Sequence, residues 1–294
     1  MKLLRIAILV ELDSPTMTEQ LAPLLRDRGH TVDIIDLSSV PEEEFTSHPE
    51  IQALTSYDIL YYRSGLDASG SPQRIIKLEE FLEGSPVKTV NLHYTKHPKV
   101  HSKTYEIQQA EKSGLEIPKS SFTSDATFSQ LSLELNLPFI SKTDEGTNGN
   151  GVHLIDTEEK LLDVQATYQN QQMIYQSFVP HDFEYRIHIM DGLAVCIWKK
   201  APPEGDFRSN EAQGGAMLEA EPKYTERLTE LSKIAFQIFG FEIFVADFML
   251  DRDTDTFYFT EINLNPGWGP ADHQATGVDV ISLTADYFEN ICKV

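Results

Sequence analysis

The 294-residue chain has little of two things, cysteine and positive charge. Its two cysteines, Cys196 and Cys292, lie far apart and outside any CxxC pattern, which argues against a disulfide scaffold or a cysteine metal site and favours a reducing, cytoplasmic location. Lysine and arginine number 24 against 46 acidic residues, a formal net charge of −22. Because phosphate contacts need clustered basic side chains, this balance argues against nucleic-acid binding. The acidic excess is either a solubility surface or a rim that attracts a cationic substrate.

Several sequence signals are also missing. No apolar run approaches the length of a membrane span, and the N-terminal run Leu3–Val10 ends at Glu11 without a small-residue cleavage site, so it reads as a strand. The following turn, VELDSPT, lacks the G-x-G-x-x-G of dinucleotide-binding folds, which argues against nicotinamide or flavin binding. Walker A and G-x-S-x-G motifs are absent as well.

The order of apolar and helical segments predicts three domains. In residues 1–92, apolar runs at Leu3–Val10, Thr31–Leu37, Tyr57–Arg63 and around Val90 alternate with helical stretches, which predicts βαβ units and a parallel sheet. Residues 93–175 are expected to begin with a helix and to continue with strands around a glycine-rich loop. Residues 176–294 are rich in strands and are expected to end in a helix. The expected fold class is therefore α/β followed by α+β.

The glycine-rich loop Thr143–Gly151 is the first candidate site. Gly146, Gly149 and Gly151 would let backbone N–H groups approach phosphate oxygens, and Lys142 stands at the end of the preceding strand. Taken alone, the segment could equally be an ordinary glycine-containing hairpin with a surface lysine.

A candidate metal site follows near the C-terminus. Asp247 and Glu261 lie in otherwise apolar strands, where a carboxylate without a partner is costly. Glu261 and Asn263 are two residues apart and therefore face the same side of their strand. Two carboxylates and an amide oxygen form a hard oxygen site suited to Mg²⁺, with Mn²⁺ as a substitute, bridging ATP phosphates. The alternative is a pair of edge carboxylates facing water.

The polar loop 201–215 is the third candidate. It contains Arg208, Asn210 and two adjacent glycines, and it could bind an anion and order over a substrate, or be a mobile surface loop. Trp268, just past the metal-site strand, is expected either to form a wall of the acceptor pocket or to pack in the core.

Together, KTDEGTNGNGV, EGDFRSN followed by a Gly-Gly pair, and EINLNPG resemble RimK-type ATP-grasp ligases from about Asn91 to the C-terminus. The resemblance implies an ATP-grasp fold behind an N-terminal parallel α/β domain. It implies that Lys103 and Lys142 contact the ATP phosphates and that the strand Tyr175–Val179 carries the adenine. Within that strand, Gln176 and Phe178 would contact the adenine. Glu184 would lie near the ribose, and Arg186 would lie near the transferred phosphate. Asp247, Glu261 and Asn263 would bind magnesium. Arg208 and Asn210 would face the acyl phosphate and the substrates.

The sequence departs from the family at two places. The hinge reads Tyr-Gln-Ser-Phe where the family usually has an acidic residue, and Leu-Asn-Pro-Gly follows the metal-site Asn263. The first departure concerns the adenine contacts, and the second suggests a distinct substrate pocket.

The expected enzyme is an ATP-dependent ligase that activates a carboxylate as an acyl phosphate and passes it to an amine. The alternatives are an ATP-grasp kinase that stops at a phosphorylated substrate and a nucleotide-binding regulator without turnover. The expected partners are a small-molecule or peptide carboxylate and an amine acceptor, without nucleic acid or membrane; a homo-oligomer stays open.

Overall fold

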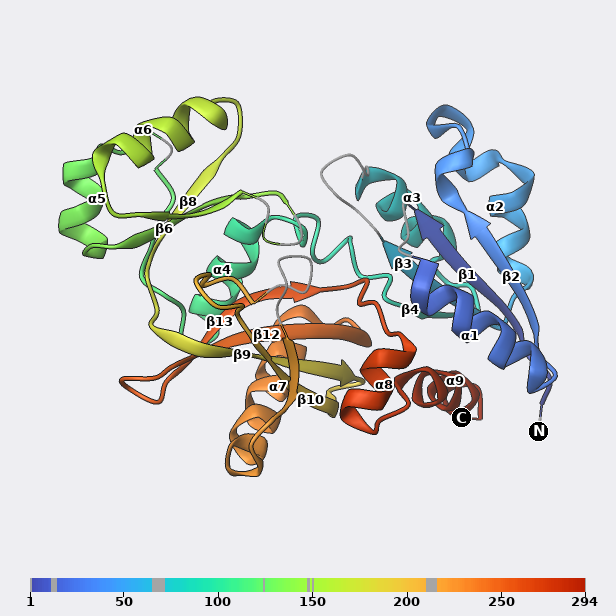
Figure 1. The fold of residues 1–294 in the computed structure, drawn as a ribbon. Coiled ribbons are helices and arrows are strands. Elements are labelled where there is room, and N and C mark those ends of the chain that lie inside the picture. Colours follow the sequence, from blue (N-terminus) through green and yellow to red (C-terminus); the bar gives the residue numbers. More distant parts are fainter. Residues whose placement is uncertain are drawn as a thin grey trace.

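The computed structural model describes residues 2–11, 15–64, 72–123, 125–146, 149, 151–209 and 216–293. Three sheets with flanking helices make up the fold, and Figure 1 shows them as three lobes, with the central sheet and α5 (Phe128–Leu135) and α6 (Glu158–Thr167) at the upper left, above the C-terminal sheet. Among the described residues, none of the helices combines the length and the apolar character that crossing a bilayer demands.

The N-terminal sheet is parallel, in the order β2-β1-β3-β4. Its strands are β1 (Arg5–Glu11), β2 (Thr31–Asp36), β3 (Ile59–Ser64) and β4 (Lys88–Val90), with α1 (Pro15–Asp27), α2 (Pro49–Ala53) and α3 (Pro72–Leu82) between them and 3-10 turns at Leu37–Ser39, Glu42–Ser47 and Leu54–Ser56. The four strands expected from the apolar runs are confirmed. Alternate residues of β1 enter two different cores, so helices and neighbouring elements cover both faces, as a parallel sheet requires.

The central sheet is antiparallel, in the order β5-β8-β6-β7. It consists of β5 (Ser120–Ser121), β6 (Phe139–Thr143), β7 (Val152–Ile155) and β8 (Met173–Ser177), and it carries α5 (Phe128–Leu135) and α6 (Glu158–Thr167). Both helices begin at a threonine cap, Thr127 and Thr157, whose hydroxyl accepts a backbone N–H. Their apolar sides bury Leu131 and Leu161 in a small core of their own.

The C-terminal sheet is also antiparallel, in the order β11-β10-β9-β12-β13. Its strands are β9 (His181–Met190), β10 (Leu193–Ala201), β11 (Ala216–Glu219), β12 (Ile243–Asp251) and β13 (Phe257–Asn263). Around it lie α4 (Lys103–Lys112), α7 (Thr225–Phe239), α8 (Pro270–Thr276), α9 (Val280–Ile291) and a 3-10 turn at Pro222–Tyr224. Strand β11 and helix α8 have no counterpart in the expectations from sequence, whereas α4 and α9 do.

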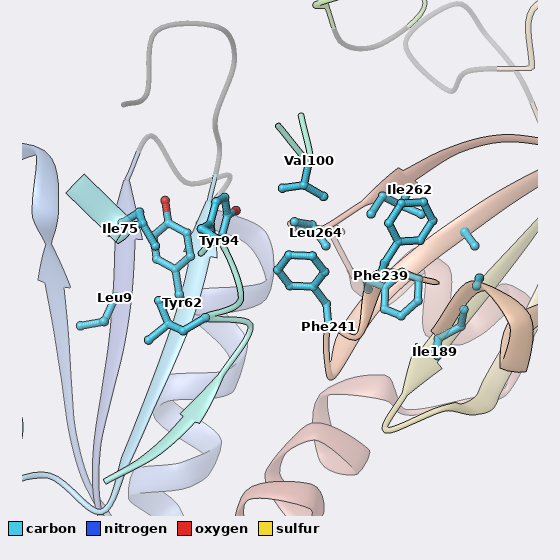
Figure 2. Close-up of a cluster of buried hydrophobic side chains, with 14 of the residues drawn as sticks. Leu9, Tyr62, Ile75, Tyr94, Val100, Ile189, Phe239, Phe241, Ile262 and Leu264 are labelled. Carbon is cyan, nitrogen blue, oxygen red and sulfur yellow. The ribbon is translucent and has the colours of Figure 1, made fainter. Parts of the chain in front are cut away.

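One continuous core joins the N-terminal sheet to the C-terminal sheet. Figure 2 shows Tyr62 and Tyr94 on one side of this core and Phe241 facing them from the other. The ring centroid of Tyr94 lies 5.6 Å from the ring centroid of Tyr62 and 5.8 Å from that of Phe241. Helix α4 packs against β13, so it lies on the C-terminal sheet although it precedes the central sheet in sequence. The domain ranges 1–92, 93–175 and 176–294 stay a prediction.

Candidate active site

A cavity opens between the central sheet, α4 and the C-terminal sheet. About 860 Å³ of space lies between the residues that line it, and this space includes the part that is open to solvent. The predicted residues in its wall are Lys103, Lys142, Gly146, Gly149, Gln176, Phe178, Glu184, Arg208, Asp247 and Glu261. Gly151, Arg186 and Asn263 are not part of the wall, and Asn210 lies outside the described residues.

Two lysines reach this cavity from different elements. Lys142 lies next to the end of β6 and is buried, and the pKa of its ammonium is lowered to about 8, first by burial and then by the charge of Lys103. Lys103 opens α4, and its Nζ donates to the carbonyl oxygen of Gly146 at 2.6 Å and lies 4.0 Å from Oε2 of Glu261. Two ammonium groups beside a glycine-rich loop are suited to bind phosphate oxygens.

Asp144 ties the glycine-rich loop to the start of α4. Its Oδ1 accepts a hydrogen bond from the backbone N–H of Thr104 at 2.7 Å and from the hydroxyl of Ser102 at 3.1 Å. Ser102 is the N-cap of α4 and accepts in turn from the N–H of Tyr105. A carboxylate at a helix N-terminus stabilises the first turn, and here it also fixes where Lys103 emerges.

The glycines of the loop have different structural roles. Gly151 has a φ of +78°, and a Cβ at this position would lie 2.6 Å from Oγ1 of Thr143. Close packing of the β6–β7 hairpin therefore requires this glycine, as the hairpin alternative supposed. Gly146 and Gly149 line the cavity, while residues 147, 148 and 150 lie outside the described part of the chain.

An ion pair between a half-buried arginine and a buried aspartate reaches the cavity wall. Arg186 on β9 stands opposite Asp247 on β12, and its Nε and Nη2 donate to Oδ1 and Oδ2 of Asp247 at 2.7 and 2.5 Å. Burial alone would raise the pKa of the Asp247 carboxyl, but the charges of Arg186 and Lys200 outweigh it, so the pKa is lowered. Burial would likewise lower the pKa of Arg186, and the carboxylate raises it. Both side chains are therefore charged at neutral pH.

Lys200 is a further member of this charged group, and it is absent from the residues expected at the site from the sequence. It is 2% exposed, and its Nζ lies 3.2 Å from Oε2 of Glu184 and 3.6 Å from Oδ2 of Asp247. Its neighbour Lys199 points to the opposite face and pairs with Glu221. The period-2 alternation of β10 separates the two lysines, but sequence alone cannot say which one faces the site.

The donor set of the predicted metal site fits a magnesium ion in its chemistry. Asp247 and Glu261 are register partners on β12 and β13, and carboxylate and amide oxygens are the ligands Mg²⁺ prefers. The Glu261 side chain is 36% exposed, whereas both oxygens of Asp247 accept from Arg186. Oδ1 of Asn263 accepts from the N–H of Asn265. Within the described residues no three His, Cys, Asp or Glu side chains gather for a metal ion, so the Asn263 amide and ligand oxygens would have to complete the shell.

Glu106 is a buried acid at the site that the sequence did not reveal. It lies on α4, one turn after Lys103, and its Oε2 accepts from the backbone N–H of Ile262 at 3.0 Å. The pKa of its carboxyl is raised to about 8, first by burial and then by the charge of Glu261. Glu106 therefore fixes β13 between the two predicted metal ligands and holds a proton at neutral pH.

Replacing Glu106 with glutamine is expected to stabilise the protein more at pH 8 than at pH 5. The unfolded carboxyl loses its proton near 4.5 and the folded one near 8, so the wild type loses stability as pH rises through that window. Glutamine keeps the hydrogen bond and has no proton to lose, so the gain at pH 8 over pH 5 should be about 3.5 kcal/mol. Urea unfolding at both values measures it, with Glu111→Gln on the exposed side of α4 as control. An equal effect of Glu106→Gln at both pH values would contradict the buried, protonated acid.

The predicted adenine hinge also borders the cavity. Gln176 on β8 is buried, and its Nε2 donates to Oγ of Ser120 at 2.8 Å, while that hydroxyl donates to the carbonyl of Pro118. Because the serine hydrogen is committed to Pro118, the amide orientation of Gln176 is fixed with Nε2 toward Ser120. The wall of the same cavity includes the apolar side chains of Ile140, Val152, Phe178, Val179 and Met249. Such a wall suits a flat heterocyclic base.

Arg208 belongs to a loop that Asp206 folds. Oδ1 of Asp206 accepts from the backbone N–H groups of Phe207 and Arg208 at 2.7 and 3.0 Å, and Oδ2 accepts from Nη2 of Arg208 at 2.7 Å. The guanidinium lowers the pKa of the Asp206 carboxyl to about 2. Arg208 is therefore held by a neighbouring carboxylate while it lines the cavity.

Trp268 packs in the core. It is 1% exposed, and its ring centroid lies 5.4 Å from the rings of both Trp198 and His188. The interpretation of Trp268 as a wall of the acceptor pocket is wrong, and its alternative, core packing, is right. An aromatic residue after a Pro-Gly turn gives no sign of its burial in sequence, since the rings it packs against, those of His188 and Trp198, lie far away along the chain.

Comparison with known proteins places this geometry in context. A family model described as the RimK-like ATP-grasp domain matches residues 101–287. A probable alpha-L-glutamate ligase of Aliivibrio fischeri (strain MJ11) is 25% identical over 296 residues, covering 97% of this chain and 95% of that protein. The ATP-grasp ligase PsnB, solved with a phosphomimetic variant of its minimal precursor, Mg and ADP, superposes with a TM-score of 0.71 at 16% identity, over 98% of this chain and 99% of PsnB. D-alanine–D-alanine ligase from Bacillus anthracis gives 0.70 at 15%, over 99% of each chain.

Proposed function

The chain belongs to the RimK-like ATP-grasp family, and from this premise we propose how its cavity works as an ATP-dependent carboxylate–amine ligase. The family match confirms the ATP-grasp fold and the ligase expected from the sequence. One observation carries the proposal: Lys103, Lys142 and Glu261 line one cavity together with an apolar hinge and with Asp247, the partner of Arg186.

The substrates are a carboxylic acid, an amine acceptor and ATP. We propose that the acid and the acceptor are amino acids or peptides, in keeping with relatives named as glutamate ligases. A cytoplasmic location suits an ATP-consuming enzyme whose two cysteines are free. Light scattering would show whether the chain forms homo-oligomers.

Each part of the cavity takes one part of the nucleotide. The adenine lies on the hinge at Gln176 and Phe178, the ribose lies by Glu184, and the phosphates lie at Lys103, Lys142 and the loop glycines. Asp247, Glu261 and Asn263 would hold magnesium, with manganese as a substitute through the same oxygen donors. When bound, the metal supplies positive charge to the phosphate oxygens.

The chain's own cations then assist two successive steps. A substrate carboxylate oxygen attacks the γ-phosphorus and the bond to ADP breaks, while Lys142 and Arg186 stabilise the charge on the transferred phosphoryl group. The amine nitrogen next attacks the carbonyl carbon of the acyl phosphate, phosphate leaves, and the nitrogen loses a proton. Arg208 from the cavity wall, and Asn210 two residues later in the sequence, would orient the acyl phosphate for this second step.

The test is ADP release by the wild-type protein across a panel of amino acids and peptides, with mass spectrometry of the products. Hydroxylamine is added in place of the amine, because an acyl phosphate gives a hydroxamate and a stable phosphorylated product does not. A hydroxamate that requires both ATP and the acid supports the ligase. A phosphorylated product that resists hydroxylamine would indicate a kinase, and the absence of turnover with every acid would indicate a regulator.

Replacing Arg208 with lysine is expected to lower ligation about tenfold while the ATP affinity stays within about threefold of wild type. Lysine cannot hold Asp206 through two nitrogens, so its charge would no longer be fixed beside the cavity. Calorimetric ATP affinity and product formation are measured side by side. Arg252→Lys, at an exposed pair with Asp182, is the control. If ATP affinity and ligation fall by equal factors, the proposal that Arg208 acts on the acyl phosphate is contradicted.

A further inference from the structure

His181 stands between the nucleotide hinge and the loop that carries Arg208. It is the first residue of β9, and its ring lines the cavity. Its Nδ1 lies 2.8 Å from the carbonyl oxygen of Val179, at the hinge, and its Nε2 lies 3.1 Å from the carbonyl oxygen of Phe207, in the loop. A carbonyl oxygen only accepts, so neutral imidazole can donate to one of them and the imidazolium to both. The ring therefore links two segments that are far apart in sequence.

On the loop side of this link, hydrogen bonds to Asp206 hold the backbone at Phe207 and Arg208. Asp206 accepts the backbone N–H groups of both Phe207 and Arg208 as well as the guanidinium. Anchoring the Phe207 carbonyl therefore anchors the whole Asp206–Arg208 turn. Residues 202–209 contain no helix or strand, so the loop depends on such side-chain anchors to hold a fixed place.

Aromatic packing supports the same link. The ring of Phe178, on the hinge, has its centroid 6.4 Å from that of His181 and 6.3 Å from that of Phe207, which it meets edge to face at 79°. The three rings form one cluster in the cavity wall. A base that occupies the hinge would therefore contact the same cluster that holds the loop.

We propose that His181 is a positioning residue that fixes the Arg208 loop to the nucleotide hinge and so sets the guanidinium in place for the acyl phosphate. The part concerning the acyl phosphate rests on the proposed ligase function. The linkage itself rests on the two carbonyl contacts and the aromatic cluster. His181 touches neither the predicted metal ligands nor the Arg186–Asp247 pair in any described hydrogen bond, so its contribution is separable from theirs.

The first test is His181→Phe, which keeps a ring for Phe178 and Phe207 and removes both ring nitrogens. The proposal expects ATP–magnesium affinity within about threefold of wild type and a kcat/KM for the carboxylate about tenfold lower or more. His181→Gln, which can donate to one carbonyl, should recover part of the loss. His273→Phe on the exposed side of α8 is the control for loss of a histidine.

Hydrogen exchange gives a readout that does not depend on turnover. With magnesium and a non-hydrolysable ATP analogue, the amides of residues 204–209 should exchange faster in His181→Phe than in wild type, while those of β9 do not change. If exchange is faster in His181→Phe but the wild-type protein ligates no substrate, the link between hinge and loop is supported and the proposed ligase function is contradicted. Unchanged exchange together with unchanged kcat/KM would overturn the proposal. An ATP affinity that falls as much as kcat/KM would also overturn it, because His181 would then belong to the nucleotide site alone.

Discussion

Replacing Lys142 with methionine is expected to lower ADP formation about a thousandfold, equivalent to about 4 kcal/mol of transition-state stabilisation. Lys142 is 8% exposed, lines the cavity and lies next to the glycine-rich loop, where little water competes for the phosphate charge. Methionine has a similar length and no charge, so the change removes the cation and little else. Single-turnover ADP release with the acid identified in the substrate screen measures the effect.

The same variant should be at least as stable as the wild type. The pKa of Lys142 is lowered in the folded protein to about 8 from 10.5, so at pH 7 the charged lysine opposes folding rather than supporting it. Lys160→Met, on α6 in an exposed pair with Asp156, is the matched control and should keep full turnover. A folded Lys142→Met protein with near-normal turnover would show that Lys142 has no part in phosphate binding.

Replacing Glu261 with glutamine is expected to reduce turnover about a hundredfold at limiting magnesium. Glutamine keeps an oxygen ligand but loses the negative charge that balances the metal. Glu261 is also the accessible carboxylate of the pair, since Arg186 occupies both oxygens of Asp247. A magnesium titration of ADP release should show the half-maximal concentration moving upward about tenfold.

Glu230→Gln on α7 removes an equal charge at an exposed position and controls for the change in net charge. Circular dichroism of both variants establishes that the sheets remain folded. If Glu261→Gln matches the wild type throughout the magnesium titration, the metal site must lie elsewhere.

The parallel N-terminal sheet could be predicted because its strands are short apolar runs, such as Leu3–Val10, separated by helices. A strand buried on both faces leaves that signal in the sequence whatever its neighbours are. Helix α8 left no such signal, since the segment from Pro270 to Thr276 is short and mostly polar. Strand β11 could not be predicted either, because it is only four residues long, follows a polar loop and is a strand through its pairing with β10.

The candidate site could be predicted where a residue type was out of place for its element. Asp247 and Glu261 in apolar strands drew attention, and they prove to be register partners in the structure. Glu106 could not be found in this way, because an acid near the start of a helix is ordinary and only packing against β13 buries it. The roles assigned to these residues remain predictions until the variants are measured.

The acyl phosphate itself is tested most directly by isotope transfer. The carboxylic acid is labelled with oxygen-18 in its carboxyl group, and the wild-type enzyme is allowed to complete ligation with ATP and the amine. Because one carboxylate oxygen becomes the bridge to phosphorus and leaves with it, the inorganic phosphate should carry one labelled oxygen per amide formed. Amide formation with unlabelled phosphate would contradict activation of the acid by phosphoryl transfer.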